Sequence, residues 1–213
     1  MQQKWWQQRF VWLAGIFGGV VIVLMPLLGG LFWRLFQPIA YPREVLFARD
    51  APMQAGFMGV NLLGNLLILL IFSALFLLAQ YHREAKLMVA VRGATIGWAV
   101  WVVFAVIWPS TSMASVISAD QTISVRALVS LIIVILLAVS FYQIGLQYGR
   151  LDHPALNNVW RLAALLMILF YILRLGVQAM GVPLIGVIDQ LFAISSVLAP
   201  VYTAVYIVRD IQA

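Results

Sequence analysis

Six long apolar stretches constrain this chain more than any other feature of its sequence. They cover about residues 10–32, 57–79, 87–108, 125–147, 159–180 and 184–208. A helix needs roughly 20 mostly apolar residues to cross the hydrocarbon core of a bilayer, and each stretch is long enough. We therefore expect an all-α fold, a polytopic membrane helix bundle of about six transmembrane helices.

The composition supports the same class. Of the 213 residues, 64% are hydrophobic and only 9% are charged, whereas a soluble domain is usually about a quarter charged. The chain has too few polar side chains to cover a surface that faces water, so its expected surroundings are the lipid bilayer. Residues 1–213 are expected to form a single transmembrane domain.

The distribution of basic residues predicts the orientation in the membrane. With both termini in the cytoplasm, eight of the 13 Lys and Arg lie inside and five lie outside, in the direction of the positive-inside rule. The inner set is Lys4, Arg9, Arg83, Lys86, Arg92, Arg150, Arg161 and Arg209, and the outer set is Arg34, Arg43, Arg49, Arg126 and Arg174. The first apolar stretch is too long for a cleavable signal peptide. Short loops favour a multi-pass protein of a bacterial inner membrane.

The sequence gives little support to catalysis. It has no cysteine, and its two histidines, His82 and His153, fall in predicted loops, where they could not hold a haem between helices. The H-E-x-x-H, Gly-x-Ser-x-Gly and Walker A patterns are absent. The basic residues are scattered, without the clusters that bind nucleic acid. We expect no enzyme, no metal, no cofactor and no nucleic-acid partner.

One pair of opposite charges is expected inside the membrane. Arg174 precedes Gly181 and Asp189 follows Pro183, on two spans joined by a very short turn. At 1.5 Å per residue both side chains come to about 10 Å from that turn, so an antiparallel hairpin predicts an Arg174–Asp189 ion pair. The pair either locks the hairpin, because an unpaired buried charge is costly, or belongs to a ligand site or a proton-sensitive switch.

Other polar side chains fall at a similar depth near the predicted outer side. Asn61 and Asn65 are four residues apart and share one helix face. Trp98 and Trp101 lie inside the third span, where they either pack against neighbouring helices or form the aromatic wall of a ligand site. The predicted pocket would suit a small anionic or zwitterionic ligand, and its candidate residues are Arg174, Asp189, Asn61, Asn65, Gln178 and Gln190.

The first outer loop, about residues 33–56, is the only sizeable connection between predicted spans. Its stretch Val45-Leu46-Phe47-Ala48 is read either as part of a plain connector or as a short amphipathic turn on the membrane surface. Glycines spaced four apart, at Gly15/Gly19, Gly93/Gly97 and Gly145/Gly149, predict close contacts between helices.

The sequence is compatible with three functions. The first is a small-solute transporter or substrate-binding membrane subunit with an outward-facing polar pocket. The second is a membrane sensor or signalling module that acts through a partner protein. The third is a structural or assembly subunit of a larger membrane complex. The protein partners expected are another membrane protein or further copies of this chain. The six-helix format is shared by all three, so the format alone does not select among them.

Overall fold

A computed structural model describes residues 4–108 and 124–210 of the chain. The described residues form six long α-helices and two 3₁₀ turns, η1 (Trp5–Gln7) and η2 (Arg43–Phe47). The long helices are α1 (Arg9–Phe32), α2 (Gln54–Tyr81), α3 (Ala85–Ile107), α5 (Val125–Arg150), α6 (Pro154–Ala179) and α7 (Ile185–Asp210). All six are long and apolar enough to cross a membrane. This confirms the all-α prediction, and the chain is an integral multi-pass membrane protein.

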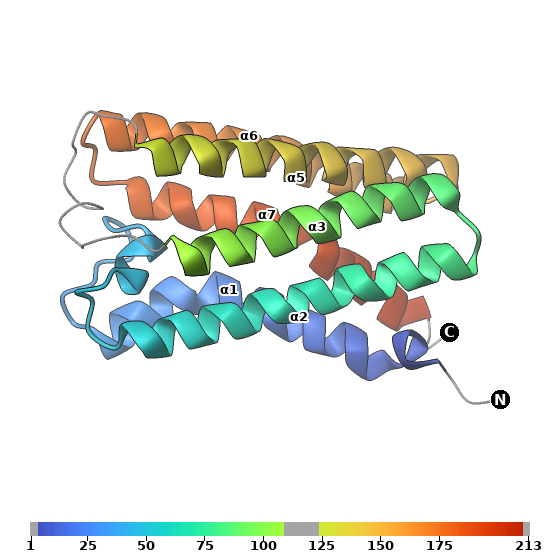
Figure 1. Cartoon of the computed structure of the whole chain (residues 1–213), viewed down its shortest axis with the longest axis horizontal. Helices are drawn as coiled ribbons and strands as arrows, with labels where there is room; N and C mark the ends of the chain where they lie inside the picture. Colours follow the sequence, from blue (N-terminus) through green and yellow to red (C-terminus); the bar gives the residue numbers. More distant parts are fainter. Residues whose placement is uncertain (1–3, 109–123, 211–213) are drawn as a thin grey trace.

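The helices form a closed ring of neighbours. Each long helix packs against the next along the chain, and α7 returns to pack against α1 (Figure 1). Both termini lie at one end of the bundle, which we call the terminal end. The opposite end carries the α1–α2 connection, residues 33–53, and the α6–α7 turn, residues 180–184; we call it the loop end.

Apolar side chains cover the outside of the ring. Phe10 is 74% exposed, and Leu31 and Ile107 are each 77% exposed. In water this surface would drive association, whereas hydrocarbon accepts it without cost. The helices therefore face lipid with the same residue types that fill their core, as expected for a membrane bundle.

The predicted glycine contacts are real helix crossings. A Cβ added at Gly15 would collide with Ile71 on α2, and one at Gly93 would lie 2.9 Å from Ser140 on α5. A Cβ at Gly145 would lie 3.0 Å from the backbone oxygen of Asn157 on α6. Side chains at these positions would push the helices apart, so glycine sets their spacing.

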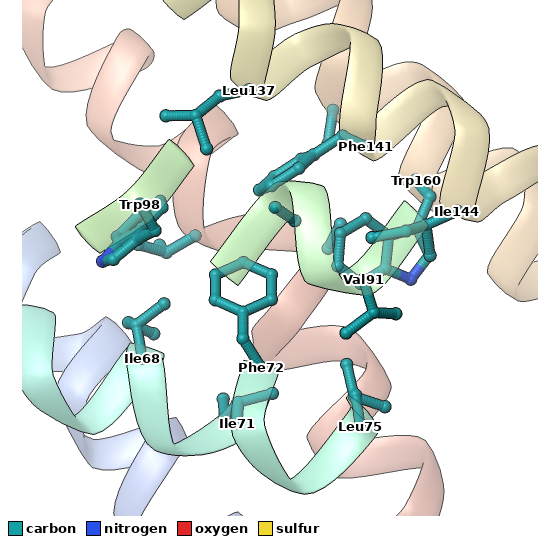
Figure 2. Packing of buried hydrophobic residues seen from close by; sticks show 14 of the residues in the cluster. Ile68, Ile71, Phe72, Leu75, Val91, Trp98, Leu137, Phe141, Ile144 and Trp160 are labelled. Atoms are coloured by element: carbon teal, nitrogen blue, oxygen red, sulfur yellow. The ribbon is translucent and has the colours of Figure 1, made fainter. Parts of the chain in front are cut away.

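An aromatic layer fills the middle of the ring (Figure 2). We define it as Phe72, Trp98, Phe141 and Trp160, from α2, α3, α5 and α6. The Phe72 ring centre lies 5.7 Å from that of Trp98 and 5.9 Å from that of Phe141. Phe141 and Trp160 meet edge to face at 4.8 Å, a favourable aromatic geometry. Trp160 donates its indole N–H to the Thr203 hydroxyl on α7 at 2.9 Å.

The α1–α2 connection, residues 33–53, differs from both interpretations of its sequence. Residues 45, 46 and 48 are fully buried, and Val45 and Leu46 pack with Met25, Phe36 and Phe57 in a second core cluster. The loop is neither a plain connector nor a turn lying on the membrane surface. It folds into the end of the bundle because its apolar residues find a space between α1 and α2 to fill.

Candidate functional site

Five charged side chains from four elements meet in one pocket at the loop end. Arg43 and Glu44 come from η2, and Arg126 comes from the start of α5. Arg174 lies near the end of α6, and Asp189 lies one turn inside α7. We call these five residues the charge cluster. Distant parts of the chain build it, since Arg43 and Asp189 are 146 residues apart.

Asp189 is held by the loop above it. Its Oδ2 accepts the Arg43 backbone N–H at 3.0 Å and the Arg43 Nε–H at 2.9 Å. Pro42, in an extended conformation, begins the η2 turn, so the Arg43 N–H is not used within the turn. Asp189 is 1% exposed. Two hydrogen bonds from one residue therefore fix both this carboxylate and the loop.

Arg174 bridges the two acids of the cluster. Its Nη2 lies 2.8 Å from Glu44 Oε2, and its Nη1 lies 3.4 Å from Asp189 Oδ1. The antiparallel α6–α7 hairpin thus brings the residues 174 and 189 to the same height, as the spacing of the sequence implies. The shorter contact, however, is to Glu44, a residue of the α1–α2 connection.

Arg126 completes the cluster from the α5 side. Its Nη1 lies 3.2 Å from Glu44 Oε2, and its Nε donates to the Trp108 carbonyl at 2.9 Å. Burial acts to raise the pKa of Glu44, but the positive charges of Arg174 and Arg126 more than offset it, so this pKa lies below its ordinary value. Glu44 is therefore an anion at neutral pH.

The charged groups of the cluster are concentrated in one place. Three guanidinium groups and two carboxylates are among the described residues that line the pocket. Ionised side chains at membrane depth are costly, so their concentration here favours a site for a charged ligand.

Two buried hydrogen-bond donors point to the same chemistry. Trp98 is 3% exposed and Arg174 is 7% exposed; both line the pocket. The Trp98 Nε1 and the Arg174 Nε have no hydrogen-bond partner in the part of the chain that the structure describes. Figure 2 shows the Trp98 nitrogen on the side of its ring away from Phe72 and Phe141. Buried donors without acceptors are rare in folded proteins, so each calls for an acceptor atom.

The cavity itself is small. Its volume is about 90 Å³, room for a few water molecules and well below the roughly 300–1,000 Å³ of a typical drug-sized pocket. Asn61, Asn65, Ser130 and Ser196 add polar groups to the wall. Asn65 donates to the Asn61 backbone oxygen at 2.8 Å.

Four of the six sequence-predicted residues line this pocket: Arg174, Asp189, Asn61 and Asn65. Gln178 and Gln190 are not among its described lining residues. Gln178 lies one turn closer to the helix end and stays partly exposed. Gln190 is the next residue after Asp189, about 100° around the helix, and its amide donates to the Val23 backbone oxygen on α1 instead.

The site residues predicted from the sequence do not include Arg43, Glu44 and Arg126. All three lie in or next to connections between the long helices, where no periodic pattern fixes the direction of a side chain. One feature of the sequence could have indicated Glu44. A buried arginine has two terminal nitrogens and can contact two carboxylates, and Glu44 in the α1–α2 connection supplies the second carboxylate that Arg174 contacts.

A second cavity, of about 670 Å³, lies at the terminal end. Trp6, Tyr148, His153 and Tyr206 are among its lining residues. The Tyr206 hydroxyl lies 3.5 Å from His153 Nδ1. The indole Nε1 of Trp6 is also buried without a partner among the described residues.

The aromatic layer separates the two cavities. Trp98, on one side of Phe72, lines the loop-end pocket, and Leu75, three residues after Phe72, lines the terminal-end cavity. Phe72 is fully buried between them. The bundle therefore has a cavity near each end and a closed apolar layer in its middle.

Comparisons with protein-family models, with curated proteins and with solved structures found no match to this chain. The chemistry of the loop-end pocket is therefore the basis for assigning a function.

Proposed function

We propose that this protein captures a small anionic or zwitterionic ligand in the loop-end pocket, as a transporter or as the substrate-binding membrane subunit of one. The proposal includes an orientation with both termini in the cytoplasm of a bacterial cell. The pocket then opens on the outer side of the inner membrane, where a solute arrives first.

The unpartnered donors carry the proposal. A buried donor without an acceptor costs about 1–3 kcal/mol, and two of them line this pocket beside three guanidinium groups. A purely structural cluster would be expected to satisfy its own groups. An incoming carboxylate, phosphate or zwitterion supplies the missing acceptors, and the guanidinium groups attract its negative charge.

The two cavities favour transport over binding alone. Alternating access needs a site that faces one side, a vestibule that faces the other and a barrier between them. Along the bundle the loop-end pocket comes first, the aromatic layer lies in the middle, and the terminal-end cavity lies beyond it. A change in the packing of Phe72 against Trp98 is the simplest movement that would connect them.

The orientation rests on the distribution of Lys and Arg. Eight of them lie toward the terminal end and five toward the loop end, so the positive-inside rule favours the terminal end as the cytoplasmic one. Because the chain has no native cysteine, single cysteines at Gln37 and at Arg83 can be labelled from either side. An impermeant thiol reagent added to intact cells should label position 37 and spare position 83.

Ligand capture can be tested with butyrate, a simple carboxylate, and butyramide, its uncharged analogue. Protein in a neutral maltoside detergent is unfolded thermally at constant ionic strength with either probe. A ligand at 100 times its Kd stabilises the folded state by about 2.7 kcal/mol. We expect butyrate to stabilise the protein and butyramide to leave it unchanged.

Variants locate the effect. Trp98→Phe removes one unpartnered donor from the pocket and should weaken butyrate binding, as should Asn65→Leu. Trp6→Phe is the matched control, because it removes a similarly unpartnered indole N–H at the other end of the bundle. Gln178→Leu is a second control outside the pocket lining. Equal effects of Trp98→Phe and Trp6→Phe, or no difference between the two probes, would contradict the proposal.

A further inference from the structure

The edge of the loop-end pocket between α2 and α3 is apolar. Leu62 on α2 and Val106 on α3 both line the pocket, and they are also 36% and 46% exposed. A residue that lines a pocket and is well exposed lies at the edge of that pocket. This edge is therefore the side on which a ligand longer than the cavity can extend.

The two sides of the pocket differ in chemistry. The charge cluster comes from η2, α5, α6 and α7, whereas α2 and α3 contribute no charged residue to the described lining. Beside Asn61, Asn65, Trp98 and Trp101, these two helices contribute the apolar residues Met58, Leu62, Val102, Phe104, Ala105 and Val106. One wall suits a charged group and the opposite wall suits a hydrocarbon chain. A ligand that satisfies both walls is amphiphilic.

The size of the cavity points the same way. About 90 Å³ holds a carboxylate or a phosphate with some water, but it does not hold a long chain as well. A chain attached to the bound group has to leave the cavity, and the exposed apolar edge at Leu62 and Val106 is the side that suits it.

We infer that the ligand of this pocket is a single-chain anionic amphiphile, with its head group in the charge cluster and its chain leaving between α2 and α3. This inference rests on the proposed capture of an anion and adds the class of ligand. The head group accepts hydrogen bonds from Trp98 and Arg174, and the chain lies along Leu62 and Val106.

A series of alkanoates with one head group and growing chains tests the inference. Butyrate, hexanoate and octanoate are equilibrated with the protein by dialysis, free ligand is measured in the aqueous phase, and binding to empty micelles is subtracted. Each methylene that moves from water onto the apolar edge should tighten binding about fourfold. The short probe reports on the head-group site alone.

Two variants separate the apolar edge from the general lipid surface. Ala105→Phe fills the apolar edge, whereas Ile107→Phe adds a similar ring two residues away at a position that does not line the pocket. We expect Ala105→Phe to abolish the gain from chain length while butyrate still binds, and Ile107→Phe to leave both unchanged. Octanoate with a photoreactive group at its chain end should label residues within 58–66 and 101–107.

The outcomes separate the two claims. In one outcome butyrate binds while longer chains bind no tighter, and in another the increase of affinity with chain length persists in Ala105→Phe. In either case the inference of an amphiphilic ligand is wrong, and the proposed anion site remains. Photolabelling spread evenly over all six helices would also contradict the amphiphilic ligand. If no alkanoate of any length binds above the level of empty micelles, the inference and the proposed function fail together.

Discussion

The middle of the bundle and its loop end both bury tryptophan, but the indole N–H groups have different surroundings. In the middle, Trp160 is fully buried and donates to the Thr203 hydroxyl. Trp98 belongs to the same aromatic layer and is 3% exposed, yet its N–H has no partner among the described residues. Burial alone therefore does not distinguish a tryptophan that only packs from one that can bind a ligand. The hydrogen-bond partner of its N–H group does.

The charge cluster extends this contrast. Each of its two carboxylates contacts two arginines. Arg174 nevertheless retains an Nε without a partner among the described residues. The loop-end pocket thus has two buried donors, Arg174 Nε and Trp98 Nε1, for which the described residues supply no acceptor, whereas the Trp160 N–H has one.

The largest expected effect is on stability at the charge cluster. Asp189→Asn leaves Arg43 and Arg174 with too little negative charge in a buried site, which should cost about 3–5 kcal/mol. Unfolding of the purified variant in mixed detergent micelles measures this loss. A change within about 0.5 kcal/mol of the original protein would show that the cluster does not hold the loop to the bundle.

The charge exchange of Arg174→Asp with Asp189→Arg sharpens the same point. In an isolated pair the exchange would restore stability. Here the new acid at position 174 would face Glu44, and the new base at position 189 would face Arg43, so like charges meet at both contacts. We expect the double variant to remain as unstable as either single variant. If the double variant regains the stability of the original protein, the Arg174–Asp189 pair of the hairpin is sufficient, and the contacts with Arg43 and Glu44 contribute little.

A smaller loss is expected in the aromatic layer. Trp160→Phe removes the hydrogen bond to Thr203 and leaves a small void, which together should cost about 1–3 kcal/mol. Trp5→Phe serves as the control, since Trp5 is 42% exposed. Thermal unfolding without added ligand should separate the two variants, and equal melting temperatures would remove the structural role of Trp160.

Trp98→Phe should affect ligand affinity more than stability, in contrast to Trp160→Phe. Losing an unpartnered buried donor offsets part of the cost of the smaller ring, so stability should stay within about 1 kcal/mol of the original. Butyrate affinity should fall about 2- to 12-fold, the worth of one hydrogen bond. A variant that loses stability and keeps its affinity would place Trp98 with Trp160 as a packing residue.

The smallest expected effect concerns acid. The pKa of Glu44 lies below its ordinary value near 4.5 because Arg174 and Arg126 outweigh the effect of burial. The ionised carboxylate therefore stabilises the fold fully above about pH 4.5, and this contribution is lost as pH falls through the lowered pKa. Unfolding measured from pH 7 to pH 3.5 should show a decline only at the acid end. Glu44→Gln should make that decline in stability smaller. If the variant has the same pH profile as the original protein, the ionised Glu44 does not stabilise the fold.

Sequence alone predicts the helices and one contact of the site. Apolar runs determine the number of spans, because a lipid-exposed span leaves the backbone no alternative to a helix or a closed barrel. The short α6–α7 turn brings Arg174 and Asp189 to one height by helix geometry alone. These features depend only on local spacing.

The rest of the site depends on how a non-periodic loop folds. Arg43 reaches Asp189 across 146 residues of chain, and the loop's apolar stretch determines this approach by packing against Met25 and Phe57. No repeat within residues 33–53 encodes that packing. The direction of Gln190 toward Val23 likewise follows from the neighbour that α7 finds in the ring.

Indole resonances offer the most direct measurement of the central claim. Protein labelled with ¹⁵N at its tryptophan side chains gives one N–H signal per indole, and Trp98→Phe and Trp160→Phe assign the two that matter. Titration with octanoate should move the Trp98 signal in the direction of a stronger hydrogen bond and leave the Trp160 signal in place. If both signals move equally, or the Trp98 signal stays still at saturating octanoate, the unpartnered donors do not hold a ligand.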